Sequence, residues 1–192
     1  MDAATPLIQV VAICDGTILC ARSCVGNAAT AISPLVSELL AATGYAFGDF
    51  AAMAFCSGPG SALGLRAALI SIKTWLIFGK NPCQLLEYCS LDMCLGLNQN
   101  ADCACAHGVG DSLIAKPRGS GVEVLSAGEG ALHGAAVFLE TRRTAGKDSG
   151  YAVANYAIGG ANFDPLSICR PSNGELGDYG SIAYRKWERP LE

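Results

Sequence analysis

A glycine-rich turn is the part of this sequence whose residue types and spacing come nearest to a chemical site. The segment FCSGPGSALGLR, Phe55 to Arg66, runs from an apolar stretch through Gly58 and Gly60 into a helix-like stretch that contains Gly64. A strand that leads through such a turn into a helix can offer free backbone N–H groups to a phosphate, because the N-terminus of a helix favours an anion. The segment therefore raises the question of a nucleotide site.

The turn lacks the residues that define the common phosphate-binding motifs. A Walker A loop has a lysine directly after its last glycine, whereas Leu65 and Arg66 follow here, and the G-x-G-x-x-x-G spacing is not the G-x-G-x-x-G of a dinucleotide site. Two interpretations remain: an anion-binding turn, or a tight structural turn whose glycines admit another backbone. The spacing favours the structural turn. The degenerate phosphate loop is predicted to comprise Gly58, Pro59, Gly60, Ser61, Gly64 and Arg66.

Few other residues could support catalysis or metal binding. Cys103, Cys105 and His107 in the segment DCACAH could hold a metal in principle, but they lack a second ligand pair at a familiar spacing. His133 is the only other histidine, and the sequence has no C-x-x-C, H-E-x-x-H or G-x-S-x-G motif. We therefore predict no catalytic residue, no metal site and no enzymatic activity for this chain.

Composition restricts the classes of partner. Charged residues make up 16% of the 192 residues, against about 25% in an average soluble domain. This shortage indicates either a surface that is covered by a partner or an apolar-rich α/β core, and both interpretations stay open. The net charge is −4 with no basic stripe, which argues against strong direct binding of nucleic acid. Most of the ten cysteines stand in apolar runs, and we expect buried thiols rather than disulfides.

The distribution of apolar residues also bears on location. No basic segment precedes an apolar run near Met1, so no signal peptide is expected. The longest apolar stretch, ALISIKTWLIFG, is interrupted by Lys73 and is too short to span a bilayer. We expect a cytoplasmic protein that does not contact a membrane.

A β-hairpin is predicted near the N-terminus. Two apolar runs, 7–14 and 17–20, flank Asp15-Gly16, a dipeptide that favours a tight hairpin turn. A helix should follow, with Asn27 as a possible N-cap and Gly44 as its end.

Proline and glycine residues indicate where the predicted helices begin and end. Pro34 fits best in a first turn, so the regular part of the first helix is expected to begin near Ile32. A second helix is expected from a Ser61 N-cap to Gly79, and it is apolar on most of its faces, which indicates that it is enclosed on most faces. A short strand, PCQLLEYCS, and a helix capped by Ser90 come next.

Alternating strands and helices of this kind indicate an α/β fold with a mixed sheet flanked by helices. We predict an N-terminal lobe over residues 1–99 and a smaller C-terminal lobe over 100–192. In the second part GVEVLSA and YAVANYAIGG read as strands, ALHGAAVFLETRR as helical or mixed, and the segment from Asp164 onward as rich in loops.

The run GPGSALGLRAALISIKTWLIFGKNP resembles the signature of the bacterial TsaB (YeaZ) family, which reads much like G-x-G-P-G-S-F-T-G-L-R-x-G before a helix. The opening DAATPLIQVVAICDGTILC is similar to that family's D-T-S-T-x-x-x-x-V-A-L-x-x-D-G, and LEYCSLDMC to its G-V-S-S-L-x-A-L. The resemblance covers Met1 to about Leu97. It departs from the pattern where Met1-Asp2 stands in place of a whole first strand, where NAATAI replaces a His-Ser pair, and where IAKPRGSGVEVLS only echoes D-A-R-x-G-E-V-Y.

The resemblance implies an actin/Hsp70-like (ASKHA) fold with ribonuclease-H-like sheets, in a group classed as glycopeptidase-like (M22-like). It implies a non-catalytic activating subunit for threonylcarbamoyladenosine modification of tRNA, paired with a TsaD-like catalytic subunit and a TsaE-like ATPase. ATP and metal would be bound by those partners, and tRNA would be bound only by the assembled complex. In isolation the chain would form a homodimer. Alternatives are a stand-alone homodimeric protein-binding module, or a weak nucleotide-binding or glycopeptidase-like hydrolase.

A partner surface is expected on the two helices beside the glycine turn. For Leu65 and Leu69 the alternative is that they are ordinary core residues, because one face of the second helix must pack on its own sheet. The predicted interface comprises Ile32, Leu35, Val36, Leu39, Leu63, Leu65, Leu69, Ile70 and Lys73.

Overall fold

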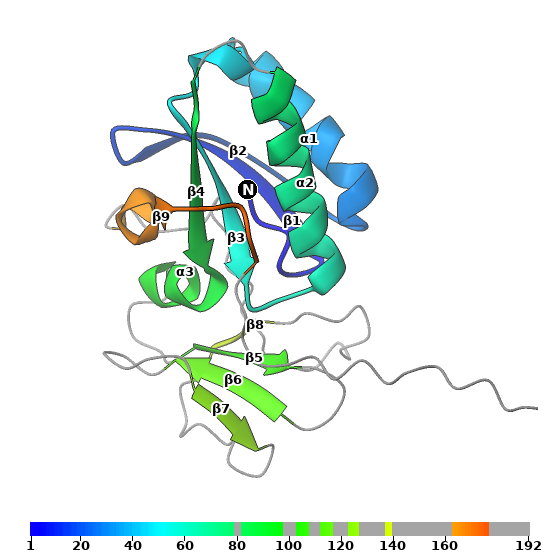
Figure 1. Ribbon diagram of the computed structural model, residues 1–192, viewed down its shortest axis with the longest axis vertical. Helices are drawn as coiled ribbons and strands as arrows, with labels where there is room; N and C mark the ends of the chain where they lie inside the picture. Colours follow the sequence, from blue (N-terminus) through cyan, green and yellow to red (C-terminus); the bar gives the residue numbers. More distant parts are fainter. Residues whose placement is uncertain are drawn as a thin grey trace, which may run out of the picture.

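The computed structural model of the chain shows an α/β fold, as predicted, with helices packed on a mixed set of strands (Figure 1). Its described strands form a two-stranded sheet β1-β2, a three-stranded sheet β3-β4-β9 and a four-stranded sheet β7-β6-β5-β8. The residues that it describes are 1–78, 82–97, 103–107, 112–116, 123–126, 137–139 and 163–176.

The predicted hairpin is present and is longer than expected. Strands β1 (Leu7–Cys14) and β2 (Thr17–Val25) pair antiparallel from Leu7 opposite Val25 to Cys14 opposite Thr17. Asp15 and Gly16 both have positive φ angles, 50° and 73°, as a type I′ turn requires. The second strand continues past the predicted end at residue 20, because the whole length of β1 is available to pair with it.

Helix α1 (Ala28–Thr43) has the predicted ends. The side chain of Asn27 accepts a hydrogen bond from the N–H of Ala29 at 3.0 Å. At the other end Gly44 adopts the left-handed conformation that favours glycine, with φ 73°, and its N–H donates to the Leu40 carbonyl at 2.9 Å.

The expected start of α1 near Ile32 is wrong, since the helix begins one turn earlier and Pro34 lies inside it. A proline inside a helix leaves the carbonyl four residues earlier without its usual donor. Here Pro34 is exposed, on the side of α1 opposite the buried Ile32 and Leu35, so that water can satisfy the carbonyl.

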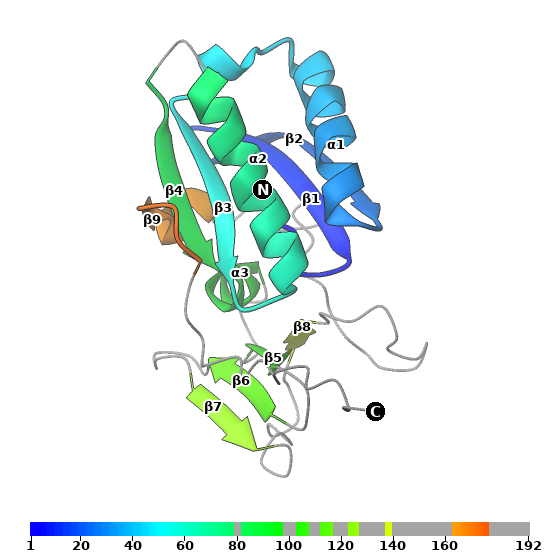
Figure 2. The same ribbon diagram turned by 45° about the vertical axis from the view of Figure 1, so that its right-hand side comes forward.

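A parallel β-α-β unit carries the glycine turn. Strand β3 (Ala52–Gly58) follows the short 3-10 helix η1 (Phe47–Asp49) and leads through the turn into helix α2 (Ala62–Phe78). Strand β4 (Gln84–Cys89) then pairs parallel with β3. Figure 2 shows α1 and α2 side by side, with α1 packed on β1 and β2 and α2 packed on β3.

Helix α3 (Ser90–Leu97) follows β4 directly and contacts a further sheet. That sheet contains β5 (Cys103–His107), β6 (Ser112–Lys116), β7 (Glu123–Ser126) and β8 (Val137–Leu139). Strand β7 confirms the strand expected in GVEVLSA, and β8 is a strand inside the segment that was expected to be helical or mixed. The strand expected in YAVANYAIGG lies outside the described residues.

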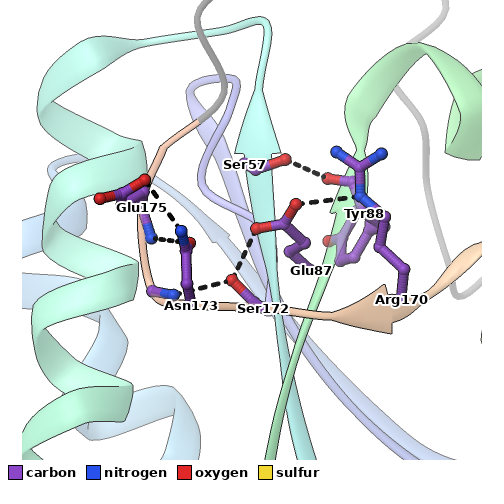
Figure 3. Close-up of polar contacts among 8 residues, drawn as sticks. Ser57, Glu87, Tyr88, Arg170, Ser172, Asn173 and Glu175 are labelled. Atoms are coloured by element: carbon purple, nitrogen blue, oxygen red, sulfur yellow. Dashed lines mark hydrogen bonds and ion pairs between the residues drawn. The ribbon is translucent and has the colours of Figure 1, made fainter.

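Residues 163–176 return to the first half of the chain. The 3-10 helix η2 (Pro165–Ile168) packs near α3, and β9 (Arg170–Pro171) pairs antiparallel with β4. In Figure 3 the carboxylate of Glu87 accepts hydrogen bonds from Arg170 Nε at 3.0 Å and from Ser172 Oγ at 2.6 Å. The division into lobes over 1–99 and 100–192 stays a prediction; residues 163–176, from the second range, contact β4 and α3 of the first.

The described core has two main parts. One lies between the β1–β2 hairpin and the two helices, and the other lies between α2, β3 and β4. A smaller cluster joins α3 to β5 through Leu91, Cys94 and Cys103. The side chains of Cys56, Cys94 and Cys103 are buried, those of five other described cysteines are partly buried, and that of Cys14 is exposed. Full burial, which the sequence predicted for most cysteines, thus holds for three of the nine described. Within the described ranges no helix combines the length and the apolar character needed to cross a bilayer.

Candidate functional site: the glycine turn and its helix

The glycine turn joins the carboxyl end of β3 to the N-terminus of α2, as the sequence predicted. Gly58 has φ 117°, a conformation that side chains rarely permit. Ser61 caps the helix: its hydroxyl accepts from the N–H of Gly64 at 3.3 Å, and its carbonyl accepts from the N–H of Leu65 at 2.9 Å. The expected end of this helix, Gly79, lies outside the described residues.

The chain's own N-terminal segment covers the turn. The N–H of Ser61 donates to the Ala4 carbonyl at 2.8 Å. A Cβ atom added at Gly60 would lie 2.6 Å from that of Ala4, and one added at Gly64 would overlap the carbonyl oxygen of Ala3. Both glycines are therefore accounted for by the close approach of another backbone, which is the structural interpretation of the turn.

The turn is also fastened to the start of α3. Ser90 Oγ donates to the Pro59 carbonyl at 2.5 Å. Close by, Ser57 Oγ donates to the Tyr88 carbonyl at 3.2 Å, as Figure 3 shows. The sequence predicted that Ser90 caps the third helix. In the structure its hydroxyl instead donates to the glycine turn, at the Pro59 carbonyl. Arg66, the remaining member of the predicted loop, is exposed on α2.

A hollow of about 160 Å³ lies beside the turn, where the N-termini of α1 and α2 approach each other. None of its lining residues carries a charged side chain, and the N–H groups of Ser61 and Gly64 are already bonded within the chain. The arrangement supplies neither a general base nor a lysine for a phosphate. The lining residues are Ala3, Thr5, Pro6, Ile8, Gly26, Asn27, Ala28, Ser61, Leu63 and Gly64.

The candidate metal ligands lie on β5. Cys103, Cys105 and His107 alternate along this strand, but only the side chain of Cys103 is described, and it contacts Cys94 with the two sulfur atoms 2.7 Å apart. Across the described part of the chain, no three His, Cys, Asp or Glu side chains come close enough to hold a metal. The absence of a metal site from the whole chain stays a prediction.

The structure divides the predicted interface residues into a buried and an exposed group. Six of them lie in the core of the chain and are exposed by 8% or less, so their assignment to a partner surface is corrected. The reason is that both helices turn these side chains toward β1, β3 and each other. The buried group comprises Ile32, Leu35, Val36, Leu39, Leu65 and Leu69; the exposed group comprises Leu63, Ile70 and Lys73.

The outer face of α2 carries an apolar row that includes Leu63 and Ile70 of the predicted interface and adds Ile77 and Phe78, which the sequence analysis did not single out. Leu63, Ile70 and Ile77 are exposed by 64%, 64% and 78%, and Phe78 by 81%. The first three are seven residues apart, close to two helical turns, and so they lie on one side of the helix. The spacing was present in the sequence, but the apolar residues on the other faces concealed it. We call Leu63, Ile70, Ile77 and Phe78 the α2 row.

Asp2 was counted among scattered carboxylates, yet it is buried, with 5% exposure. Its Oδ1 accepts from the N–H of Ala4 at 2.9 Å, and its Oδ2 lies 3.2 Å from the hydroxyl of Tyr88. These contacts hold the segment that covers the glycine turn. The carboxylate thus has a structural role, which its position in the sequence could not show.

Comparison with known proteins bears on the fold. No family model matches the sequence, and no curated protein sequence matches it significantly. The solved structure of YeaZ from Pseudomonas aeruginosa superposes with a TM-score of 0.53 and 22% identity, covering 65% of this chain and 64% of that chain. The chain has a YeaZ-like fold. A crystal structure of an uncharacterized protein with similarity to peptidase YeaZ, also from Pseudomonas aeruginosa, gives the same values, so the chain spans just under two thirds of each YeaZ-like structure.

Proposed function

We propose that this chain is a non-catalytic partner subunit for threonylcarbamoyladenosine modification of tRNA, of the ASKHA type, which pairs with a TsaD-like catalytic subunit. A TsaE-like ATPase would complete the complex in the cytoplasm. In this proposal ATP, metal and tRNA are bound by the other subunits or by the assembled complex. The YeaZ-like fold supports the family, and the α2 row supports the partner role.

The α2 row is the observation that carries the proposal. Full burial of one large aliphatic or aromatic side chain is worth roughly 1.5–3 kcal/mol, and four such side chains lie mostly exposed on one helix. Lys73, also exposed on α2, gives the surface a charged neighbour, as at the rim of many interfaces. A helix of a partner laid along α2 would cover these side chains.

The glycine turn supports the non-catalytic half of the proposal. The N–H of Ser61 donates to the Ala4 carbonyl, the N–H of Gly64 donates to the Ser61 hydroxyl, and the hollow beside the turn has no charged lining. A turn that is closed in this way serves as scaffold for α2. We further propose that a second copy covers the α2 row when the catalytic partner is absent, since the same apolar side chains would otherwise face water.

A reconstituted modification reaction tests the proposal. It contains a TsaD-like subunit, a TsaE-like subunit, threonylcarbamoyl-adenylate and tRNA, with or without this chain. The proposal expects modified tRNA only when the chain is present, and no ATP turnover by the chain alone. Equal product without the chain would contradict the subunit role and would favour the homodimeric binding module.

A further inference from the structure

Helix α3 and strand β5 meet at two buried sulfur atoms. Cys94 of α3 and Cys103, the first residue of β5, are both 0% exposed. The Sγ atom of Cys103 lies 2.7 Å from that of Cys94. Two sulfur atoms in ordinary non-bonded contact stand farther apart than two carbon atoms, which need about 3.5–4.0 Å. Only a small movement therefore separates this pair from a disulfide, in which the sulfur atoms are about 2.0 Å apart.

The fold holds both cysteines in place. On α3, the hydroxyl of Ser90, one turn before Cys94, donates to the glycine turn and so holds the start of the helix. On β5, Cys103 pairs with Lys116 of β6 on one side and with Val137 of β8 on the other. Backbones that are fixed in this way bring the two thiols together without the loss of loop-closure entropy that a flexible chain undergoes.

The surroundings of the pair suit an uncharged link. The side chains packed around the two sulfur atoms are those of Leu91, Cys89, Leu95 and Leu97. A disulfide carries no charge and no hydrogen-bond donor, so it needs no polar partner in such a cluster, whereas a thiolate does. The cluster therefore favours the oxidised pair over an ionised thiol.

We propose that Cys94 and Cys103 are a redox modification site, at which a small disulfide compound such as glutathione disulfide forms a reversible link between α3 and β5. The link joins the helix that contacts the glycine turn to the four-stranded sheet β7-β6-β5-β8. In a compartment that is kept reducing, such a link is transient and follows the redox state. The site lies on other elements than the α2 row, and this proposal does not depend on the proposed function.

The reaction consists of two exchange steps. The thiolate of one cysteine attacks a sulfur of glutathione disulfide, which forms a mixed disulfide and releases one glutathione thiolate. The thiolate of the second cysteine attacks the cysteine sulfur of the mixed disulfide, which forms the Cys94–Cys103 bond and releases the second glutathione. Two cysteine thiols lose two electrons and two protons, and one glutathione disulfide becomes two thiols. Because buried thiols are inert, the first step takes place when the cluster opens locally.

The test equilibrates the full chain in buffers of increasing glutathione disulfide and decreasing glutathione, followed by acid quenching and alkylation of the remaining thiols. Cleavage before Asp92, Asp102 and Asp111 then leaves the two cysteines in separate fragments, 92–101 and 102–110. Mass spectrometry quantifies the linked fragments. The redox ratio at half-formation gives the effective concentration of one thiol at the other.

The same titration in concentrated urea measures the pair in the unfolded chain, where only loop closure brings the thiols together. We expect the effective concentration in the native chain to be at least about tenfold higher, because the fold already holds the sulfur atoms in contact. Amide exchange in β5 should slow when the link forms, while exchange at Leu19, on β2, should not change.

Two variants serve as controls. Cys94 is the only cysteine of its fragment, and Cys94→Ala should abolish the link. Fragment 102–110 also contains Cys105, and Cys105→Ser should leave the link unchanged. The main measurement uses the unaltered chain, in which fragmentation of the linked peptides assigns the bond to Cys103 or to Cys105, so it does not depend on the folding of either variant.

Three results would overturn the proposal. The first is an effective concentration that is no higher in the native chain than in urea. The second is a bond from Cys94 to Cys105 or to another cysteine in place of Cys103. The third is formation of the link without slower amide exchange in β5.

Discussion

The N–H of Ser61 donates to the carbonyl of Ala4 across 2.8 Å, and this contact decides how the glycine turn is used. One of the N–H groups at the start of α2 that could face an anion is therefore bonded to the chain's own N-terminal segment. Gly60 and Gly64 are the residues that let this segment come so near. The glycine turn joins α2 to residues 2–5 through this hydrogen bond and the close packing at the two glycines.

The first prediction concerns these glycines. Gly64→Ala should lower the free energy of unfolding by about 1–3 kcal/mol or more, because the new methyl group would overlap backbone at Ala3 and cannot be relieved by a rotamer change. Gly26→Ala is the matched control, since a Cβ atom there meets nothing within 4 Å. Urea unfolding followed by circular dichroism measures both. Equal midpoints for the two variants would show that the close packing at Gly64 is absent.

The second prediction separates the two faces of α2. Leu69→Asp should unfold the chain or cost several kcal/mol, because Leu69 is 8% exposed and a carboxylate there would be buried without a partner. Ile70→Asp, one residue later, should change stability by about 0.5 kcal/mol or less, since Ile70 is 64% exposed. Thermal unfolding of the two variants tests this, and similar losses in both would mean that the outer face of α2 is covered within the chain.

The elements next to the turn could be predicted because their signals are local. Asp15-Gly16 specifies its own hairpin turn, and Asn27 and Gly44 cap their own helix. The two faces of α2 could not be told apart, because leucine and isoleucine stand on both, and only the position of the sheet makes Leu69 core and Ile70 surface.

The return of residues 163–176 could not be predicted for a related reason. Arg170 and Glu87 are 83 residues apart in sequence. Neither segment has a local sequence pattern that predicts contact with the other. The buried role of Asp2 is equally non-local, since it depends on Tyr88. The start of α1 was predicted too late because Pro34 was expected to lie in the first turn. A proline inside a helix is tolerated where its face is exposed to water, and exposure cannot be deduced from the sequence alone.

The third prediction concerns the attachment of β9 to β4. Ser172→Ala should cost about 1.5–3 kcal/mol, because Ser172 Oγ donates to a carboxylate oxygen of Glu87, whose side chain is only 14% exposed. Arg170→Ala should cost about 0–1 kcal/mol, since the arginine side chain is 69% exposed and its ion pair is screened by solvent. Denaturant unfolding ranks the two variants, and a larger loss for Arg170→Ala would contradict the assignment.

The fourth prediction is a pH dependence at alkaline pH. Burial raises the pKa of the Cys56 thiol well above its ordinary value of 9.0, because desolvation disfavours the thiolate. Above pH 9 the unfolded chain loses this proton while the folded chain keeps it, so folding stability should fall as pH rises further. Cys56→Ala should flatten the fall between pH 9 and pH 10.5, whatever it does to stability at pH 7. An unchanged slope would mean that Cys56 does not titrate differently in the two states.

The central claim is that the α2 row is the surface on which this chain meets its catalytic partner. The direct measurement is the dissociation constant between a TsaD-like subunit and three forms of this chain: the unaltered chain, the double variant Ile70→Asp/Ile77→Asp, and the control Leu19→Asp, which removes an exposed leucine from β2. The account predicts that the folded double variant binds at least about a hundredfold more weakly, which corresponds to about 2.7 kcal/mol, while the control binds like the unaltered chain. Undiminished binding by the folded double variant would contradict it.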